Sequence, residues 1–80
     1  MQDDEITFDF NKLRGKIKEV FNTQTALASA MKTNEATLSN KLNNNVEFSH
    51  KEIIKICTLL HIPFIEIPEY FFTLKVQKTE

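Results

Sequence analysis

The chain has 80 residues, of which 41% are hydrophobic, with a formal net charge of −1 and one cysteine, Cys57. This length suits one compact domain with a core that is only just sufficient, and a single cysteine excludes an internal disulfide. No apolar run approaches the roughly 20 residues that cross a bilayer, and the first residues are acidic where a secretory leader would be basic. We therefore expect a soluble intracellular protein.

A first helix is indicated by apolar residues at helical spacing from Phe10 to Phe21, with Asp9 or Asn11 as its cap. Thr23 is a favourable N-cap for a second helix, which would turn Leu27, Ala28 and Met31 inward.

Asn34 or Thr33 would cap a third helix, with Leu38 and Leu42 facing the core. The three asparagines at 43–45 then predict a polar break, because asparagine favours turns over helix interiors.

Ser49 and Glu52 form a capping-box pattern at the start of a fourth helix. Its apolar face would comprise Ile53, Ile56, Cys57 and Leu60. Pro63 and Pro68 allow at most a short helical turn on each side, because proline inside a helix removes a hydrogen bond.

Near both ends of the chain the apolar residues alternate with polar ones, as in half-buried strands. The alternating residues are Ile6, Phe8 and Phe10, and then Phe72, Leu74 and Val76. A strand needs a partner, so either the termini pair within one chain or the C-terminal strand pairs with a second copy in a dimer. The sequence leaves both arrangements open.

Residues 24–42 combine a short helix, a tight turn and a second short helix, which is typical of a helix-turn-helix. Two helices that cross closely require a small residue at the crossing, and Ala28 occupies that position. The turn usually has glycine after the last residue of its first helix, where the backbone is often left-handed. Lys32 stands there instead, which predicts either some strain or a slightly different turn.

Residues 10–72 resemble the small phage helix-turn-helix regulators often called Cro-like, within the class of phage repressors and modulators of repression. The matching segments are residues 13–18, 23–24, 27–28, 37–39, 48–53 and 67–72. The helical pattern and this resemblance together indicate an all-α fold of four to five short helices around a central helix-turn-helix, to which the alternation from Phe72 to Val76 would add a short C-terminal β-strand. This organisation would divide the chain into an acidic tail at 1–8, a helix-turn-helix domain at 9–72 and a strand or tail at 73–80.

By this resemblance, Gln24 matches a position that holds the DNA backbone and braces the recognition helix. The third helix would enter the major groove of operator DNA in the cytosol of a bacterial host. Asn40 would address adenine, Glu35 would accept from cytosine and Ala36 would touch a thymine methyl group. The remaining candidates are Asn34, Ser39 and Asn43 on the outward face, with Lys32, Thr37 and Lys41 as phosphate contacts.

The expected function is a regulator of the lysogenic or lytic switch that binds double-stranded operator DNA, as a homodimer or beside a partner repressor. Residues 10–60 carry eight Lys and Arg against four Glu, a surplus of four that permits phosphate contact. The third helix itself carries one lysine and one acid, which fits DNA poorly. The alternative is therefore an antirepressor that binds the phage repressor protein through the same surface.

An enzyme, a cofactor and a metal site have little support in the sequence. Cys57 and His61 lie four residues apart, with His50 two turns earlier, but the paired cysteines typical of a structural metal site are absent. One glycine in the whole chain excludes a glycine-rich phosphate loop. We expect a binding protein without a membrane contact.

Overall fold

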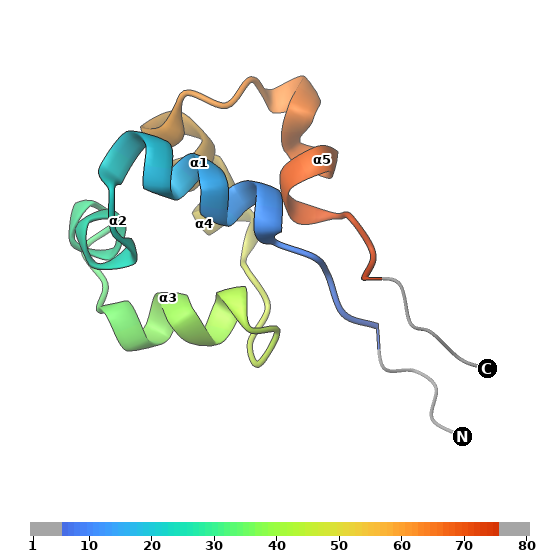
Figure 1. Ribbon diagram of the computed structural model, residues 1–80, viewed down its shortest axis with the longest axis horizontal. Helices are drawn as coiled ribbons and strands as arrows, with labels where there is room; N and C mark the ends of the chain where they lie inside the picture. Colours follow the sequence, from blue (N-terminus) through green and yellow to red (C-terminus); the bar gives the residue numbers. More distant parts are fainter. Residues whose placement is uncertain (1–5, 76–80) are drawn as a thin grey trace.

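The computed structural model describes residues 6–75, which fold into five α-helices and one 3-10 turn (Figure 1). The elements are α1 (Asn11–Phe21), α2 (Gln24–Ala30), α3 (Glu35–Leu42), α4 (His50–Leu60), η1 (Phe64–Glu66) and α5 (Ile67–Phe71). The predicted all-α class is therefore confirmed. Pro63 precedes η1 and Pro68 lies in the first turn of α5, so only short helical turns form around the two prolines, as expected. No helix within residues 6–75 is long and apolar enough to span a membrane.

Local side-chain bonds explain where three of the helices begin. Thr23 accepts from the backbone N–H of Ala26 at 3.1 Å to start α2, and Asn34 accepts from Thr37 at 2.8 Å to start α3. At α4 the capping box of Ser49 and Glu52 is complete in both directions. These three caps confirm the sequence-based predictions.

The start of α1 corrects the prediction of Asp9 or Asn11 as its cap residue. The N-cap is Phe10, whose side chain cannot accept a hydrogen bond and is buried in the core instead. Asp9 still contributes from outside the helix, since its carboxylate accepts from the N–H of Asn11 at 2.8 Å. Burial of Phe10 thus places the cap, and the flanking acid satisfies one of the free amides.

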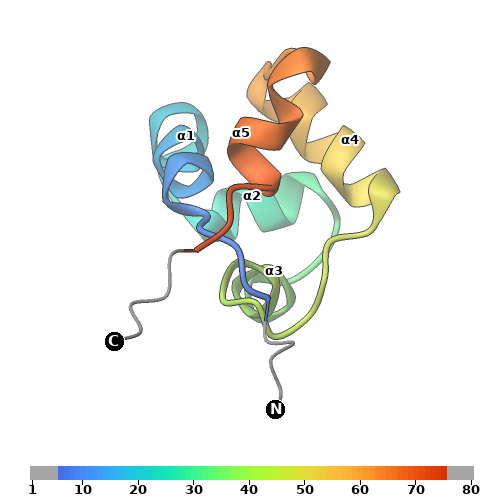
Figure 2. The same ribbon diagram turned by 90° about the vertical axis from the view of Figure 1, so that its right-hand side faces the viewer.

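The core lies between α1, α2, α4 and α5, with α3 closing it below the turn (Figures 1 and 2). Its fully buried side chains include Leu13, Ile17, Leu27, Leu38, Ile56, Cys57, Leu60 and Phe71. Ala28 is 1% exposed, as expected for a small residue where two helices cross.

Three aromatic rings join the N-terminal arm, the loop before α4, and α5. Phe48 meets Phe10 at 5.4 Å and Phe71 at 5.3 Å between ring centroids, both in edge-to-face geometry. Edge-to-face pairs of this kind stabilise by more than their buried area alone. This cluster therefore holds both terminal segments against the helical body.

The two terminal segments pair with each other within the chain (Figure 2). Phe8 and Leu74 form an isolated antiparallel bridge, with bonds from Asp9 N–H to the Thr73 carbonyl at 2.8 Å and from Lys75 N–H to the Thr7 carbonyl at 3.0 Å. The predicted strands are thus reduced to one bridge in the described residues, and Val76 lies outside them. Of the two pairings left open by the sequence, the one within a chain is present.

Candidate binding surface on helix α3

Helix α3 packs on the core through Leu38 and Leu42 and turns its other side outward. Five of the candidate residues at this helix are exposed: Asn34, Glu35, Ala36, Asn40 and Asn43. Thr37 and Ser39 are half-buried at the edges of the same face. The structure therefore brings the outward candidates together on one surface.

Lys41 lies at the opposite edge of α3 and is engaged by α4. Its ammonium is 3.2 Å from the carboxylate of Glu52, and its side chain is only 13% exposed. Partial burial alone would raise the pKa of the Glu52 carboxyl, but the Ser49 backbone N–H and the Lys41 charge outweigh burial and lower it. Lys41 therefore neutralises an acid within the fold and contributes little free charge to the surface.

A chain of hydrogen bonds connects α1, α2 and α3 beside the candidate surface. Arg14 donates to the Gln24 side-chain oxygen at 3.0 Å, and Gln24 in turn donates to the Glu35 carboxylate at 3.0 Å. Gln24 thus links the start of α3 to α1 through Arg14. Its amide oxygen and nitrogen are both engaged within the protein.

Arg14 also fixes the far end of α3. Its guanidinium donates to the carbonyl of Leu42 at 3.1 Å and to the side-chain oxygen of Asn43 at 2.9 Å. Because arginine offers several donors in a rigid fork, Arg14 can bind the C-terminal end of α3 directly and reach its start through Gln24. Arg14 is not among the residues predicted from the sequence, and no local signal marks it, since its two partners at the end of α3 lie 28 and 29 residues away.

The turn between α2 and α3 is closed by a left-handed Lys32, with φ of 62°. The N–H of Lys32 donates to the Ser29 carbonyl at 3.0 Å, and the N–H of Thr33 donates to the Ala28 carbonyl at 2.9 Å. This pair of bonds is the Schellman ending of a helix, which favours glycine at the left-handed residue. The structure therefore shows the usual turn with a left-handed lysine, and not a different turn, and the Lys32 side chain is exposed.

The asparagine run after α3 has three separate structural tasks. Asn43 accepts from Arg14, and Asn45 donates weakly to the side chain of Asn40 at 3.4 Å. Asn44, with φ of 66°, binds the backbone of Phe8 in the N-terminal arm through both the oxygen and the nitrogen of its side-chain amide. The predicted polar break is therefore an ordered connection.

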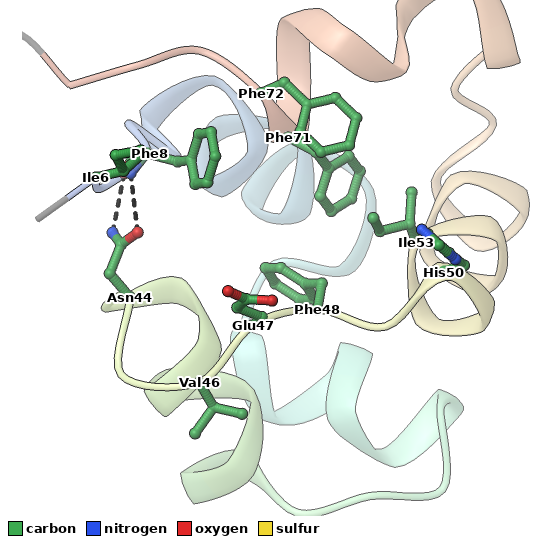
Figure 3. Close-up of a pocket in the computed structure, with 10 residues that line it drawn as sticks. All are labelled: Ile6, Phe8, Asn44, Val46, Glu47, Phe48, His50, Ile53, Phe71 and Phe72. Atoms are coloured by element: carbon green, nitrogen blue, oxygen red, sulfur yellow. Dashed lines mark hydrogen bonds between the residues drawn. The ribbon is translucent and has the colours of Figure 1, made fainter. Parts of the chain in front are cut away.

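A groove of about 340 Å³ lies beside this connection (Figure 3). Its lining residues are Ile6, Phe8, Asn44, Val46, Glu47, Phe48, His50, Ile53, Phe71 and Phe72. Tyr70 and Phe71 are buried in the core, whereas Phe72 is 51% exposed at the rim. Two of these three aromatic residues therefore belong to the core, and the third borders the groove.

Cys57 is fully buried, and burial raises the pKa of its thiol. No three His, Cys, Asp or Glu side chains within residues 6–75 are grouped so that they could hold a metal ion. The two candidate binding features in the described part of the chain are the polar outward face of α3 and the largely apolar groove beside Asn44.

Comparison with known proteins places this surface in a wider context. Residues 6–74 match the family model described as a protein of unknown function, DUF739. Among solved structures, the chain is similar to the modulator of repression (MOR) of the temperate bacteriophage TP901-1 from Lactococcus lactis, with 41% sequence identity and a TM-score of 0.75. The match covers 88% of this chain and 95% of that one. A search of curated proteins found no significant match.

Proposed function

Because the chain belongs to the DUF739 family and resembles a phage modulator of repression, we propose that it is an antirepressor that binds the repressor protein of a temperate phage. The proposed contact surface is the outward face of α3, centred on Glu35 and Asn40. Binding there would control the choice between lysogenic and lytic growth by changing how much repressor is free to act.

The observation that carries this proposal is the charge of the α3 surface. Glu35 contributes an exposed carboxylate, whereas the nearby cations Arg14 and Lys41 are held by bonds within the fold. Lys32 is exposed at the turn, and no ion pair is formed by it among residues 6–75. Affinity for DNA depends mainly on cations that meet phosphates, which this face largely lacks. A face of side-chain amides with one carboxylate, and with a single lysine at the adjoining turn, suits a protein partner better.

The test is to measure binding to the purified repressor encoded by the same phage or prophage, by titration calorimetry. Glu35→Gln and Asn40→Ala should each raise the dissociation constant about tenfold, which is a loss of about 1.4 kcal/mol of binding free energy. Lys18→Ala, an exposed change on α1, is the matched control and should leave affinity unchanged. Absence of any complex at micromolar concentrations would remove this function.

Direct binding to operator DNA is the second candidate, and the arrangement of α2, turn and α3 with exposed Asn34, Ala36 and Asn40 favours it. A dimer would then contact two half-sites about 34 Å apart. Mobility shifts on switch-region DNA at several salt concentrations test it, because phosphate contacts make affinity fall with salt. Glu35→Lys separates the two candidates, since it should strengthen DNA binding and abolish binding to the repressor.

A further inference from the structure

The bridge between the terminal segments has two outer edges, which differ in whether their backbone groups are hydrogen-bonded. Phe8 and Leu74 form a pair in which the bridging hydrogen bonds belong to their neighbours, so their own N–H and C=O groups point away from each other. The outward groups of Phe8 are both satisfied by the side-chain amide of Asn44, at 2.8 and 2.9 Å. This edge is therefore closed.

The edge at Leu74 is open in the described part of the chain. Among residues 6–75, no backbone or side-chain hydrogen bond is formed by the N–H or the C=O of Leu74. Its side chain is 62% exposed, and Phe72, two residues earlier, is 51% exposed. An apolar edge with free backbone groups is a template for another extended segment.

We infer that the open edge at Leu74 pairs antiparallel with the same edge of a second copy of this chain. In a two-fold arrangement centred on Leu74, each Leu74 exchanges both backbone bonds with its counterpart, and their apolar side chains meet on one face. On the opposite face, Thr73 of one copy lies beside Lys75 of the other. No two like charges are therefore placed directly opposite each other.

Charge complementarity supports a second copy as the occupant. Asp9 is the neighbour of Thr73 across the bridge within one chain, as the bond from Asp9 N–H to the Thr73 carbonyl shows. Lys75 of the second copy would thus lie two strand spacings from Asp9, about 10 Å between backbones. The two side chains together span that separation, and the symmetry forms this ion pair twice.

The interface is small, which determines the strength of association. Stable dimers bury roughly 1,200 Å² or more, and one pair of short edge segments buries less. The dimer should therefore be weak, with a dissociation constant on the order of 0.1 to 1 mM. This assembly is independent of the proposed repressor-binding function, because it uses neither Glu35 nor Asn40.

The experiment is sedimentation analysis of the full chain between about 10 µM and 2 mM, with the chain and two variants compared. Leu74→Pro removes the N–H that would bond to the second copy, while the bridge within the chain uses Thr73 and Lys75 and is retained. Leu74→Val keeps the N–H and the preference for strand structure, and is the matched control. Dimerisation should rise with concentration in the native chain and in Leu74→Val, and fall at least tenfold in Leu74→Pro.

Amide NMR spectra over the same concentrations locate the contact. The Leu74 amide signal should shift with concentration, whereas the Phe8 amide, already bonded to Asn44, should not. Unchanged Phe8 and Asn44 signals in Leu74→Pro would show that this variant is folded. A native chain that stays monomeric to 2 mM, or a dimer that Leu74→Pro leaves intact, would overturn the inference.

Discussion

The side-chain amide of Asn44 binds the backbone of Phe8 as a neighbouring strand would, accepting from its N–H at 2.8 Å and donating to its carbonyl at 2.9 Å. The two residues are 36 positions apart, so this contact fastens the N-terminal arm to the end of α3. The arm then lies between Asn44 on one side and the C-terminal segment on the other. One side chain thus positions the arm that lines the groove.

Replacing Asn44 should therefore destabilise the fold in two separable steps. Asn44→Gly removes both hydrogen bonds but accepts the left-handed backbone, and should lower the free energy of unfolding by about 1 to 2 kcal/mol. Asn44→Ala loses the same bonds and adds about 1 kcal/mol of strain at φ of 66°. Urea unfolding measures both values. Equal stabilities of the two variants would contradict the strain component.

Lys32 offers the opposite case, in which a substitution should stabilise the protein. Lys32→Gly relieves the left-handed backbone at φ of 62° and should raise the free energy of unfolding by about 0.5 to 1 kcal/mol. The control is Lys55→Gly, because Lys55 is an exposed lysine in the interior of α4. There the same change should cost about 1 kcal/mol. Changes of the same sign at both positions would exclude the proposed strain at Lys32.

Arg14 should matter for stability and for the geometry of α3. Arg14→Ala removes bonds to Gln24, Leu42 and Asn43 and should lower the free energy of unfolding by about 2 kcal/mol. The side-chain amide signals of Gln24 in an NMR spectrum should also shift, because Gln24 loses the partner that orients it towards Glu35. Lys18→Ala on the same helix should leave both measurements unchanged.

These contacts mark the boundary of what the sequence could predict. The caps at Thr23, Asn34 and Ser49 were predictable because each depends on residues three positions apart. The inward apolar faces were predictable for the same reason, since helical periodicity is local. Arg14 and Asn44 bind partners 10 to 36 residues away, and which segments meet is decided by packing of the whole core. The α1 cap was missed because burial of Phe10 overrode local capping preference.

The candidate surface shows the same division. The outward residues of α3 follow from the inward positions of Leu38 and Leu42, so Glu35 and Asn40 could be placed from the sequence. The charge that remains free could not be placed, because it depends on tertiary pairs. From the sequence, Lys41 is expected to be a surface cation that contacts phosphate. In the structure it pairs instead with Glu52 and joins α3 to α4.

Glu52 makes stability depend on pH in acid. Its pKa is lowered in the folded protein, so its contribution is fully present above the pKa of the unfolded chain and is lost as the pH falls through the folded value. Between about pH 5 and pH 3, the native chain should lose more stability than Glu52→Gln, which keeps the side-chain oxygen of the capping box but has no charge to lose.

At pH 7 the free energy of unfolding of the native chain should exceed that of Glu52→Gln by less than about 1 kcal/mol, because Glu52 remains partly exposed to solvent. The two stability curves, measured by urea unfolding at each pH, should converge as Glu52 becomes protonated. Lys41→Met provides the complementary control, since removing the cation should raise the pKa of Glu52 and move the loss of stability to higher pH. A constant difference between the native chain and Glu52→Gln from pH 7 to pH 3 would show that the charge of Glu52 does not stabilise the fold.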